Sequence, residues 1–116
     1  MTTDQMINLI PLVLILAFFI WRKMKFNSVR KDISSLLKSG AIIVDVRSPE
    51  EFKGACNPKS VNIPVSDIAT HANQLDKKRP IVVCCASGVR SATATRVLKQ
   101  IGFENVINAG PWTNTL

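Results

Sequence analysis

The sequence contains few of the residues that build disulfide frameworks and metal centres, and this scarcity excludes several classes of protein. Its 116 residues include three cysteines and one histidine. An odd number of cysteines fits no fully paired disulfide framework, so we expect a reducing compartment and at least one free thiol. The histidine and cysteines do not have the spacing of a metal site, and we predict neither a metal nor another cofactor.

Acidic residues are also few, with eight against fifteen basic ones and a formal net charge of +7. Part of this excess is local, because five basic residues fall between positions 22 and 31 without an acid among them. No pattern of aromatic residues between basic ones supports nucleic-acid binding, and the cluster directly follows an apolar segment. We therefore predict anionic lipid headgroups, and not nucleic acid, as its partner.

The apolar segment Gln5–Trp21 carries no charge over seventeen residues, the lower limit of the about 17–25 that span a bilayer. Arg22 and Lys23 would extend it at the interface. A cleaved signal peptide is the alternative, but Asp4 precedes the run and no small-residue cleavage pattern follows it. Because the positive charges lie on the C-terminal side, we predict a single-pass anchor in the cell membrane, with the N-terminus outside and the remaining domain in the cytoplasm.

We divide the chain into an anchor with its basic flank over residues 1–25 and a soluble domain over residues 26–116. Within the domain we expect a polar linker over Phe26–Lys31, followed by a short helix that Asp32 caps and Gly40 ends. Short apolar strands then alternate with helical segments, with no internal repeats. The strands are expected at 41–46, 60–64, 81–84 and 105–108, and the helices at about 49–52, 67–75 and 89–101. This alternation indicates an α/β fold with a mostly parallel sheet flanked by helices.

Cys85 has the most informative surroundings in the chain, because it follows the apolar run Ile81–Cys84 and opens a short loop before a helix. Backbone N–H groups of such a loop and first helical turn converge on one point, where anions bind and a cysteine has its pKa lowered. Gly88 permits the tight turn, and Arg90 adds a planar cation suited to an oxyanion. We predict a reactive thiolate at Cys85. Cys84 is expected to pack as a small hydrophobe, with a resolving thiol as the alternative.

Four motifs, in this order, resemble those of the single-domain rhodaneses. They are Asp45–Phe52, Gly54 with Val61–Pro64, the loop Cys85–Ser91, and Gly102–Val106. The match extends from Ile33 to about Trp112 and implies the three-layer rhodanese-like α/β fold, preceded here by one transmembrane helix. It also implies a sulfurtransferase that moves a sulfane sulfur from thiosulfate or a persulfide to a thiol or cyanide.

The resemblance further assigns roles to individual residues. Cys85 would carry the sulfur as a persulfide, and Arg90 would help to seat the anionic donor. The loop amides that would cradle the persulfide belong to Ala86, Ser87, Gly88, Val89 and Arg90. For Asp45 and Arg47 we expect a supporting charge pair, or hydrogen bonds that fix the loops at the end of a strand.

The chain departs from the family pattern in two places. Gly54-Ala55-Cys56 lacks the histidine that the family usually has there, and Ala109-Gly110-Pro111-Trp112 replaces a Gly-Gly turn and terminal helix. We expect the second departure to leave the edge of the core thinly covered. We interpret Cys56 as a bystander, His71 as a solvated side chain and Trp112 as part of the core.

Two other functions remain open at this point. Counted from Cys84, the spacing to Arg90 and Ser91 is that of cysteine-dependent phosphatases. A membrane-tethered binding module without turnover is the second alternative, because a fold alone does not determine function. A Cys/His hydrolase is disfavoured, since it needs a base beside its thiol and His71 lies in a polar helical stretch. The anchor would raise the local concentration near a membrane protein partner, which the sequence does not identify.

Overall fold

The computed structural model describes residues 2–116, and the side chains of all of these except residues 26–30. A four-stranded sheet stands at its centre in the order β2-β1-β3-β4, and all three strand pairings are parallel. The strands are β1 (Ile42–Asp45), β2 (Val61–Asn62), β3 (Ile81–Cys85) and β4 (Val106–Pro111). Helices cover both faces of the sheet, which confirms the predicted α/β fold.

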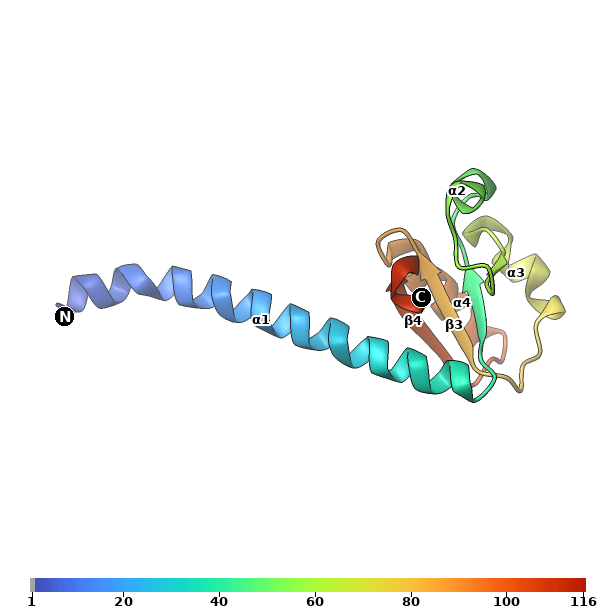
Figure 1. Ribbon diagram of the computed structural model, residues 1–116, viewed down its shortest axis with the longest axis horizontal. Coiled ribbons are helices and arrows are strands. Elements are labelled where there is room, and N and C mark those ends of the chain that lie inside the picture. The colour runs from blue at the N-terminus through green and yellow to red at the C-terminus, as the bar shows by residue number, and fades with distance from the viewer. Residues whose placement is uncertain (1) are drawn as a thin grey trace.

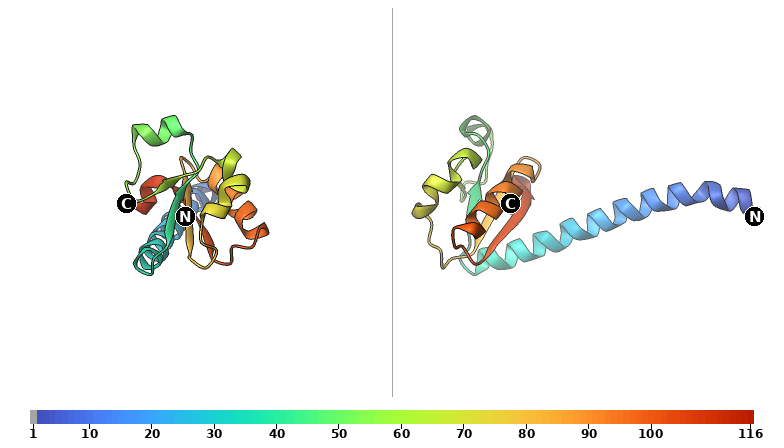
Figure 2. Two further views of the ribbon diagram at one scale, coloured as in Figure 1. Left: turned by 90° about the vertical axis from the view of Figure 1, so that its right-hand side faces the viewer. Right: turned by 180° about the vertical axis from the view of Figure 1, so that it is seen from behind.

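Strands β1 and β3 are buried on both faces because their side chains, except that of Asp45, are apolar and mostly β-branched. Successive side chains of β3 enter different clusters: Val83 and Cys85 pack with the helix α4 (Val89–Gln100), whereas Val82 and Cys84 pack with the end of the helix α1 (Thr3–Lys38). α1 and α4 therefore lie on opposite sides of the sheet, as the end-on view of Figure 2 shows. The result is three layers.

α1 is a single continuous helix of 36 residues, and it corrects the prediction of a linker followed by a short capped helix. The backbone of 26–31 is helical and Asp32 lies inside the helix rather than at its start. The physical reason is that no glycine or proline occurs between Pro11 and Gly40, so nothing stops propagation once the helix has formed. Ile33, Leu36 and Leu37 in the last turns pack against the sheet, while the rest projects away from the domain (Figure 1).

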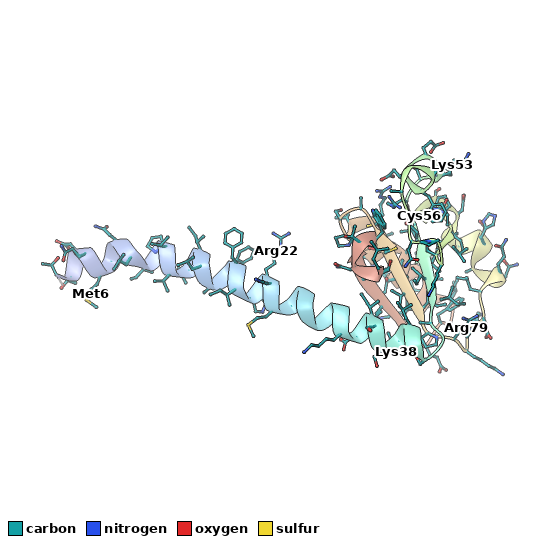
Figure 3. All side chains as sticks on the ribbon, viewed as in Figure 1. Met6, Arg22, Lys38, Lys53, Cys56 and Arg79 are labelled. Carbon is teal, nitrogen blue, oxygen red and sulfur yellow. The ribbon has the colours of Figure 1, made fainter. Side chains whose placement is uncertain are left out.

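The projecting part of α1 is apolar and exposed. The stretch Thr3–Lys25 is long and apolar enough to cross a membrane, with a mean hydropathy of 1.9, and none of it is buried against the rest of the described chain. The labelled side chains of Met6 and Arg22 in Figure 3 extend away from this part of the helix. A signal sequence near an N-terminus meets the same criteria of length and composition.

Other elements differ from the prediction in extent. The helix expected over about 67–75 is divided into the 3₁₀ turn η1 (Val65–Asp67), α3 (Ile68–His71) and the 3₁₀ turn η2 (Ala72–Gln74). β2 has only two residues, and β3 includes Cys85 as its last one. The helix α2 (Pro49–Gly54) begins as predicted, with a capping box formed by Ser48 and Glu51.

The C-terminal edge is covered by a 3₁₀ turn, η3 (Trp112–Thr115), in place of a longer helix. The side-chain amide of Asn57 holds this turn by donating to the Thr115 carbonyl at 3.0 Å. Trp112 is partly buried against the cluster that α1 covers. An open groove of about 1190 Å³ is lined by residues of α1, the edge strand β2 and η3. This groove agrees with the expectation that the edge of the core is thinly covered.

Candidate active site

Cys85 lies at the carboxyl end of the central strand β3, where the chain leaves the sheet and turns into α4. The turn depends on Gly88, whose φ of +101° is in the left-handed region that favours glycine. In this conformation the Gly88 N–H points back along the loop and donates to the Cys85 sulfur at 2.9 Å. The Cys85 residue is fully buried, so its sulfur is enclosed by the loop that follows it.

The sulfur of Cys85 receives several hydrogen bonds, and these determine its ionisation. Burial raises the pKa of the thiol, but hydrogen bonds from the Ser91 side chain and from the backbone of Ser91, Gly88 and Ser87 lower it by more. The resulting pKa is below the ordinary value for cysteine. The Ser91 hydroxyl oxygen lies 3.3 Å from the sulfur. The loop is therefore built to stabilise an anionic sulfur.

Of the predicted cradle residues, Ser87 and Gly88 supply backbone donors to the sulfur. Ala86, Ser87 and Val89 have exposed side chains, and Gly88 is partly buried. Ser91 acts on the sulfur through both its hydroxyl and its backbone, although it is outside the predicted set. Its place as the last residue of the quoted loop motif is the signal that could have identified it.

Arg90 does not stand free over the loop, because its guanidinium forms a bidentate pair with Glu51 at 2.7 and 3.0 Å. This pair lowers the pKa of Glu51 to about 2, with the Ser48 backbone hydrogen bond adding to the effect. Both side chains are more than a third exposed, so solvent weakens the attraction between them. In the structure, therefore, the carboxylate of Glu51 occupies the guanidinium of Arg90 in a partly solvated ion pair.

Asp45 and Arg47 form the predicted charge pair, and it is buried. The Arg47 guanidinium donates to the Asp45 carboxylate at 2.9 to 3.1 Å, and its remaining capacity reaches the carbonyl of Ala55 at 2.7 Å. The Trp112 ring stacks on this guanidinium, with 4.9 Å from its carbon to the ring centroid. The pair therefore joins the end of β1, the loop after α2 and the C-terminal turn.

The remaining cysteines and the histidine have different surroundings. Cys84 is buried in the apolar cluster on the other face of the sheet, as predicted, and burial raises the pKa of its thiol to about 12, with the Asp45 charge adding to the rise. Cys56 is partly buried near α2, at the end of the domain far from Lys38 and Arg79 (Figure 3). His71 is exposed, and its Nδ1 lies 3.1 Å from the Asp67 carbonyl.

The groove beside α1 is separate from this thiol. The residues that line it come from α1, β1, β2 and η3, with others from the segment before β3, and the loop residues 85–90 are not among them. The groove is wide and no cysteine lines it, whereas the loop encloses the Cys85 thiol in a confined space. We therefore assign the candidate active site to the loop.

The fold and the loop together define a class of protein: an α/β domain in which a central parallel strand delivers a cysteine to the amides of a loop and the first turn of a helix. A family model, the rhodanese-like domain, matches residues 29–109. The chain belongs to this family, and the resemblance found in the four motifs is confirmed.

Curated relatives agree with this assignment. A thiosulfate sulfurtransferase of Pseudomonas syringae is 36% identical over 72 residues, which cover 62% of this chain and 68% of the relative. A putative sulfur carrier protein of Bacillus subtilis is 41% identical over 75 residues, which cover 61% of this chain but only 40% of the relative. The chain thus spans less than half the length of the Bacillus protein.

Solved structures resemble the domain to a similar degree. A human single-domain sulfurtransferase has a TM-score of 0.60, with 30% identity over 72% of this chain and 88% of that one. A rhodanese from E. coli, solved with anions, has a TM-score of 0.61 with 28% identity over 65% of this chain and 91% of that one. Together with the curated relatives, these structures support a sulfur-transfer function and an enzyme of the rhodanese family.

Proposed function

We propose that this chain is a sulfurtransferase that carries a sulfane sulfur as a persulfide on Cys85. The observation that carries the proposal is the enclosed Cys85 sulfur, which accepts from the Gly88 N–H at 2.9 Å and from the Ser91 backbone, with the Ser91 hydroxyl oxygen 3.3 Å away. These donors stabilise the thiolate, which is the nucleophile in sulfur transfer. Names of relatives that include sulfurtransferase support the same chemistry.

The reaction has two half-reactions with balanced electrons. The Cys85 thiolate attacks the outer sulfur of thiosulfate, the S–S bond of thiosulfate breaks, and sulfite leaves with the electron pair. With a persulfide donor, a thiolate leaves instead. An acceptor thiolate or cyanide then attacks the outer sulfur of the Cys85 persulfide, and the Cys85 thiolate leaves. Arg90, at the mouth of the loop, would leave its ion pair with Glu51 and bind the anionic donor instead.

Intact-protein mass spectrometry tests the proposal directly. After incubation with thiosulfate, the parent protein should gain the mass of one sulfur atom and lose it again on addition of cyanide. The Cys85→Ala variant should gain nothing, while the Cys84→Ala variant should behave like the parent. If the parent gains no sulfur from thiosulfate or from a low-molecular-weight persulfide, the binding module without turnover is the better description.

A cysteine-dependent phosphatase is disfavoured by the position of Cys84. Its sulfur is in the apolar cluster on the face opposite the loop, and its pKa of about 12 leaves almost no thiolate at neutral pH. The Cys85 sulfur is fully enclosed, which suits attack on a terminal sulfur atom better than on a larger phosphoryl group. Hydrolysis of an aryl phosphate that is lost in Cys84→Ser but kept in Cys85→Ser would reverse this assignment.

We further propose that Thr3–Lys25 anchors the protein in the cell membrane with the catalytic domain in the cytoplasm. Its length, its hydropathy and its exposure support an anchor, and the basic residues after Trp21 support the orientation. The full chain should stay with membranes after alkaline carbonate extraction, and protease added to intact spheroplasts should spare the domain. A mature protein that begins after residue 21 would instead identify the segment as a cleaved signal sequence.

A further inference from the structure

A closed ring of hydrogen bonds connects the Cys85 sulfur to Asn108 on the neighbouring strand. The Ser91 hydroxyl lies 3.3 Å from the sulfur and donates to the Asn108 side-chain oxygen at 2.6 Å. The Asn108 side-chain amide donates to the Gly88 carbonyl at 3.1 Å, and the Gly88 N–H donates to the sulfur at 2.9 Å. Gly88 and Ser91 at the start of α4 and Asn108 in β4 thus form a ring with Cys85 that includes the reacting sulfur.

An irregularity in β4 places Asn108 in this ring. Val83 pairs with Asn108, but the next residue, Cys84, pairs with Gly110, so the register shifts by one residue at Ala109. The Gly110 N–H donates to the Asn108 side-chain oxygen at 2.9 Å, which fixes the amide orientation that this network implies. The bulge therefore directs a polar side chain from the sheet toward the loop.

The Ser91 hydroxyl has one hydrogen and two neighbours that accept it. When Cys85 is a thiol, its S–H can donate to the Ser91 oxygen, and Ser91 donates to Asn108. When Cys85 is a thiolate, the sulfur needs a donor, and rotation of the hydroxyl hydrogen supplies one. The Asn108 oxygen then still accepts from Gly110, so no buried acceptor is left without a partner.

We propose that Ser91 is a catalytic residue whose hydroxyl donates to the Cys85 sulfur whenever that sulfur is anionic, and that Asn108 is a positioning residue that competes for the same hydrogen. No proton is gained or lost by the exchange, which is a rotation about the Ser91 C–O bond.

The exchange assists the second half-reaction, a role that rests on the proposed function. In the persulfide, the inner sulfur of Cys85 is neutral and Ser91 donates to Asn108. When the acceptor attacks, the bond between the outer sulfur and the acceptor forms, the S–S bond breaks, and its electron pair stays on Cys85. Ser91 then turns its hydrogen to the departing thiolate, which lowers the barrier to its release.

The charged groups around the site do not change in the variants used for the test. They are Asp45 and Arg47 at the end of β1, Glu51 in α2, and Arg90 on α4, while the neighbouring thiol of Cys84 faces the other side of the sheet. Substitutions at Ser91 and Asn108 by alanine remove no charge. A change in the ionisation of Cys85 in these variants therefore reports on the hydrogen-bond ring itself.

The test is the pH dependence of Cys85 alkylation by iodoacetamide, measured by mass in the full chain solubilised in detergent. Ser91→Ala should raise the pH midpoint, so that the thiolate fraction below the midpoint falls about tenfold, the effect of one hydrogen bond to an anion. Ser91→Thr, which keeps a hydroxyl, should restore most of it. Thr93→Ala, which removes an exposed hydroxyl from the same helix, is the matched control and should leave the midpoint unchanged.

A double-mutant cycle then isolates the competition by Asn108. Asn108→Ala also removes the bond to the Gly88 carbonyl, but that loss is common to chains with and without Ser91 and cancels in the cycle. The change in the pH midpoint caused by Asn108→Ala is measured in the parent and in the Ser91→Ala chain. We expect the change in the parent to lie further toward low pH than the change in the Ser91→Ala chain. A coupling of zero, or one that raises the midpoint, overturns the proposal.

Turnover provides a separate readout. Release of sulfur from the preformed persulfide to cyanide should slow about tenfold in Ser91→Ala, and more than its formation slows. Equal slowing of both half-reactions would contradict the proposal that Ser91 stabilises the departing Cys85 thiolate. If the parent forms no persulfide at all, the proposed function fails, yet the alkylation cycle still decides whether the ring operates, because alkylation requires no sulfur donor.

Discussion

Cys84 and Cys85 are adjacent in the chain, yet their thiols have opposite surroundings. Cys84 points into the apolar cluster under α1, where burial raises its pKa to about 12. Cys85 points to the other face, at the base of the loop, where hydrogen bonds outweigh burial and lower its pKa. Both residues are almost fully buried, so exposure does not distinguish them. Hydrogen-bond donors directed at the Cys85 sulfur therefore favour its thiolate, whereas burial without such donors keeps Cys84 protonated.

The largest expected difference between the two thiols is in turnover. Cys85→Ser should lose sulfur transfer by more than about a thousandfold, because the nucleophile is absent. Cys84→Ser should stay within a few-fold of the parent, since its sulfur faces away from the loop. Both variants are assayed with thiosulfate and cyanide at one protein concentration. Retained turnover in Cys85→Ser would show that the comparison assigns the nucleophile to the wrong cysteine.

The two thiols should also affect stability in opposite directions as pH rises. The raised pKa of Cys84 stabilises the fold below the ordinary thiol pKa, and this contribution is lost as pH rises toward about 12, at about 1.4 kcal/mol per pH unit. The lowered pKa of Cys85 has the reverse sign: its contribution is present above the ordinary thiol pKa and is lost as pH falls through the folded value.

Urea unfolding of the parent and the Cys84→Ala variant between pH 8 and about 10.5 measures this difference. The free energy of unfolding should fall less steeply with pH in Cys84→Ala, although the variant is less stable at pH 8 because it loses buried volume. All other ionisable groups are common to both chains, so their contributions cancel in the comparison. Identical slopes would mean that Cys84 is not shielded as the structure indicates.

Substitution of Arg90 tests whether its guanidinium binds the anionic sulfur donor near Cys85. Arg90→Ala should raise the KM for thiosulfate about tenfold, because a charge-assisted pair with the donor is lost. Arg96→Ala is the matched control, since Arg96 is an exposed arginine on the same helix. If both variants keep the parent KM, the pair between Arg90 and Glu51 serves only to fix α2 against the loop.

Gly88 provides a smaller effect, on the stability of the loop that distinguishes Cys85. Gly88→Ala should destabilise the fold by about 1–2 kcal/mol, because a Cβ is strained at φ +101° and would lie 3.2 Å from the Gly110 Cα. Gly54→Ala is the control, since nothing lies within 4 Å of its Cβ position and its backbone is helical. Thermal unfolding compares the two, and equal melting temperatures would contradict the close approach of β4 to the loop.

Much of the fold could be predicted because its signals are local. The apolar runs gave β1 and β3, Ser48 and Pro49 marked the start of α2, and Gly102 marked the end of α4. The continuity of α1 was missed because Asp32 is a residue typical of helix starts, and a possible cap does not reveal whether the preceding residues are already helical. Packing of Ile33 and Leu37 on the sheet favours the longer helix.

The site was predicted only where its residues are consecutive. Cys85, Gly88 and Arg90 lie close together in the sequence, from the end of β3 to the first turn of α4, and strand-to-helix geometry explains them. Glu51 and Asn108 come from α2 and β4, and their contacts with Arg90 and Ser91 depend on how the strands are ordered. The position of Asn108 further depends on a one-residue register shift in β4, for which the sequence contains no clear signal.

The unbroken course of α1 has a mechanical consequence for the proposed anchor. From Lys25 to Lys38 the helix adds about 20 Å at 1.5 Å per residue, and its last turns are packed on the sheet. A continuous helix is stiff, so it would hold the domain at a fixed distance from the membrane surface. The domain would still be able to rotate about the helix axis. A partner that exchanges sulfur with Cys85 would have to present its own sulfur at that distance from the membrane, whatever the rotation of the domain.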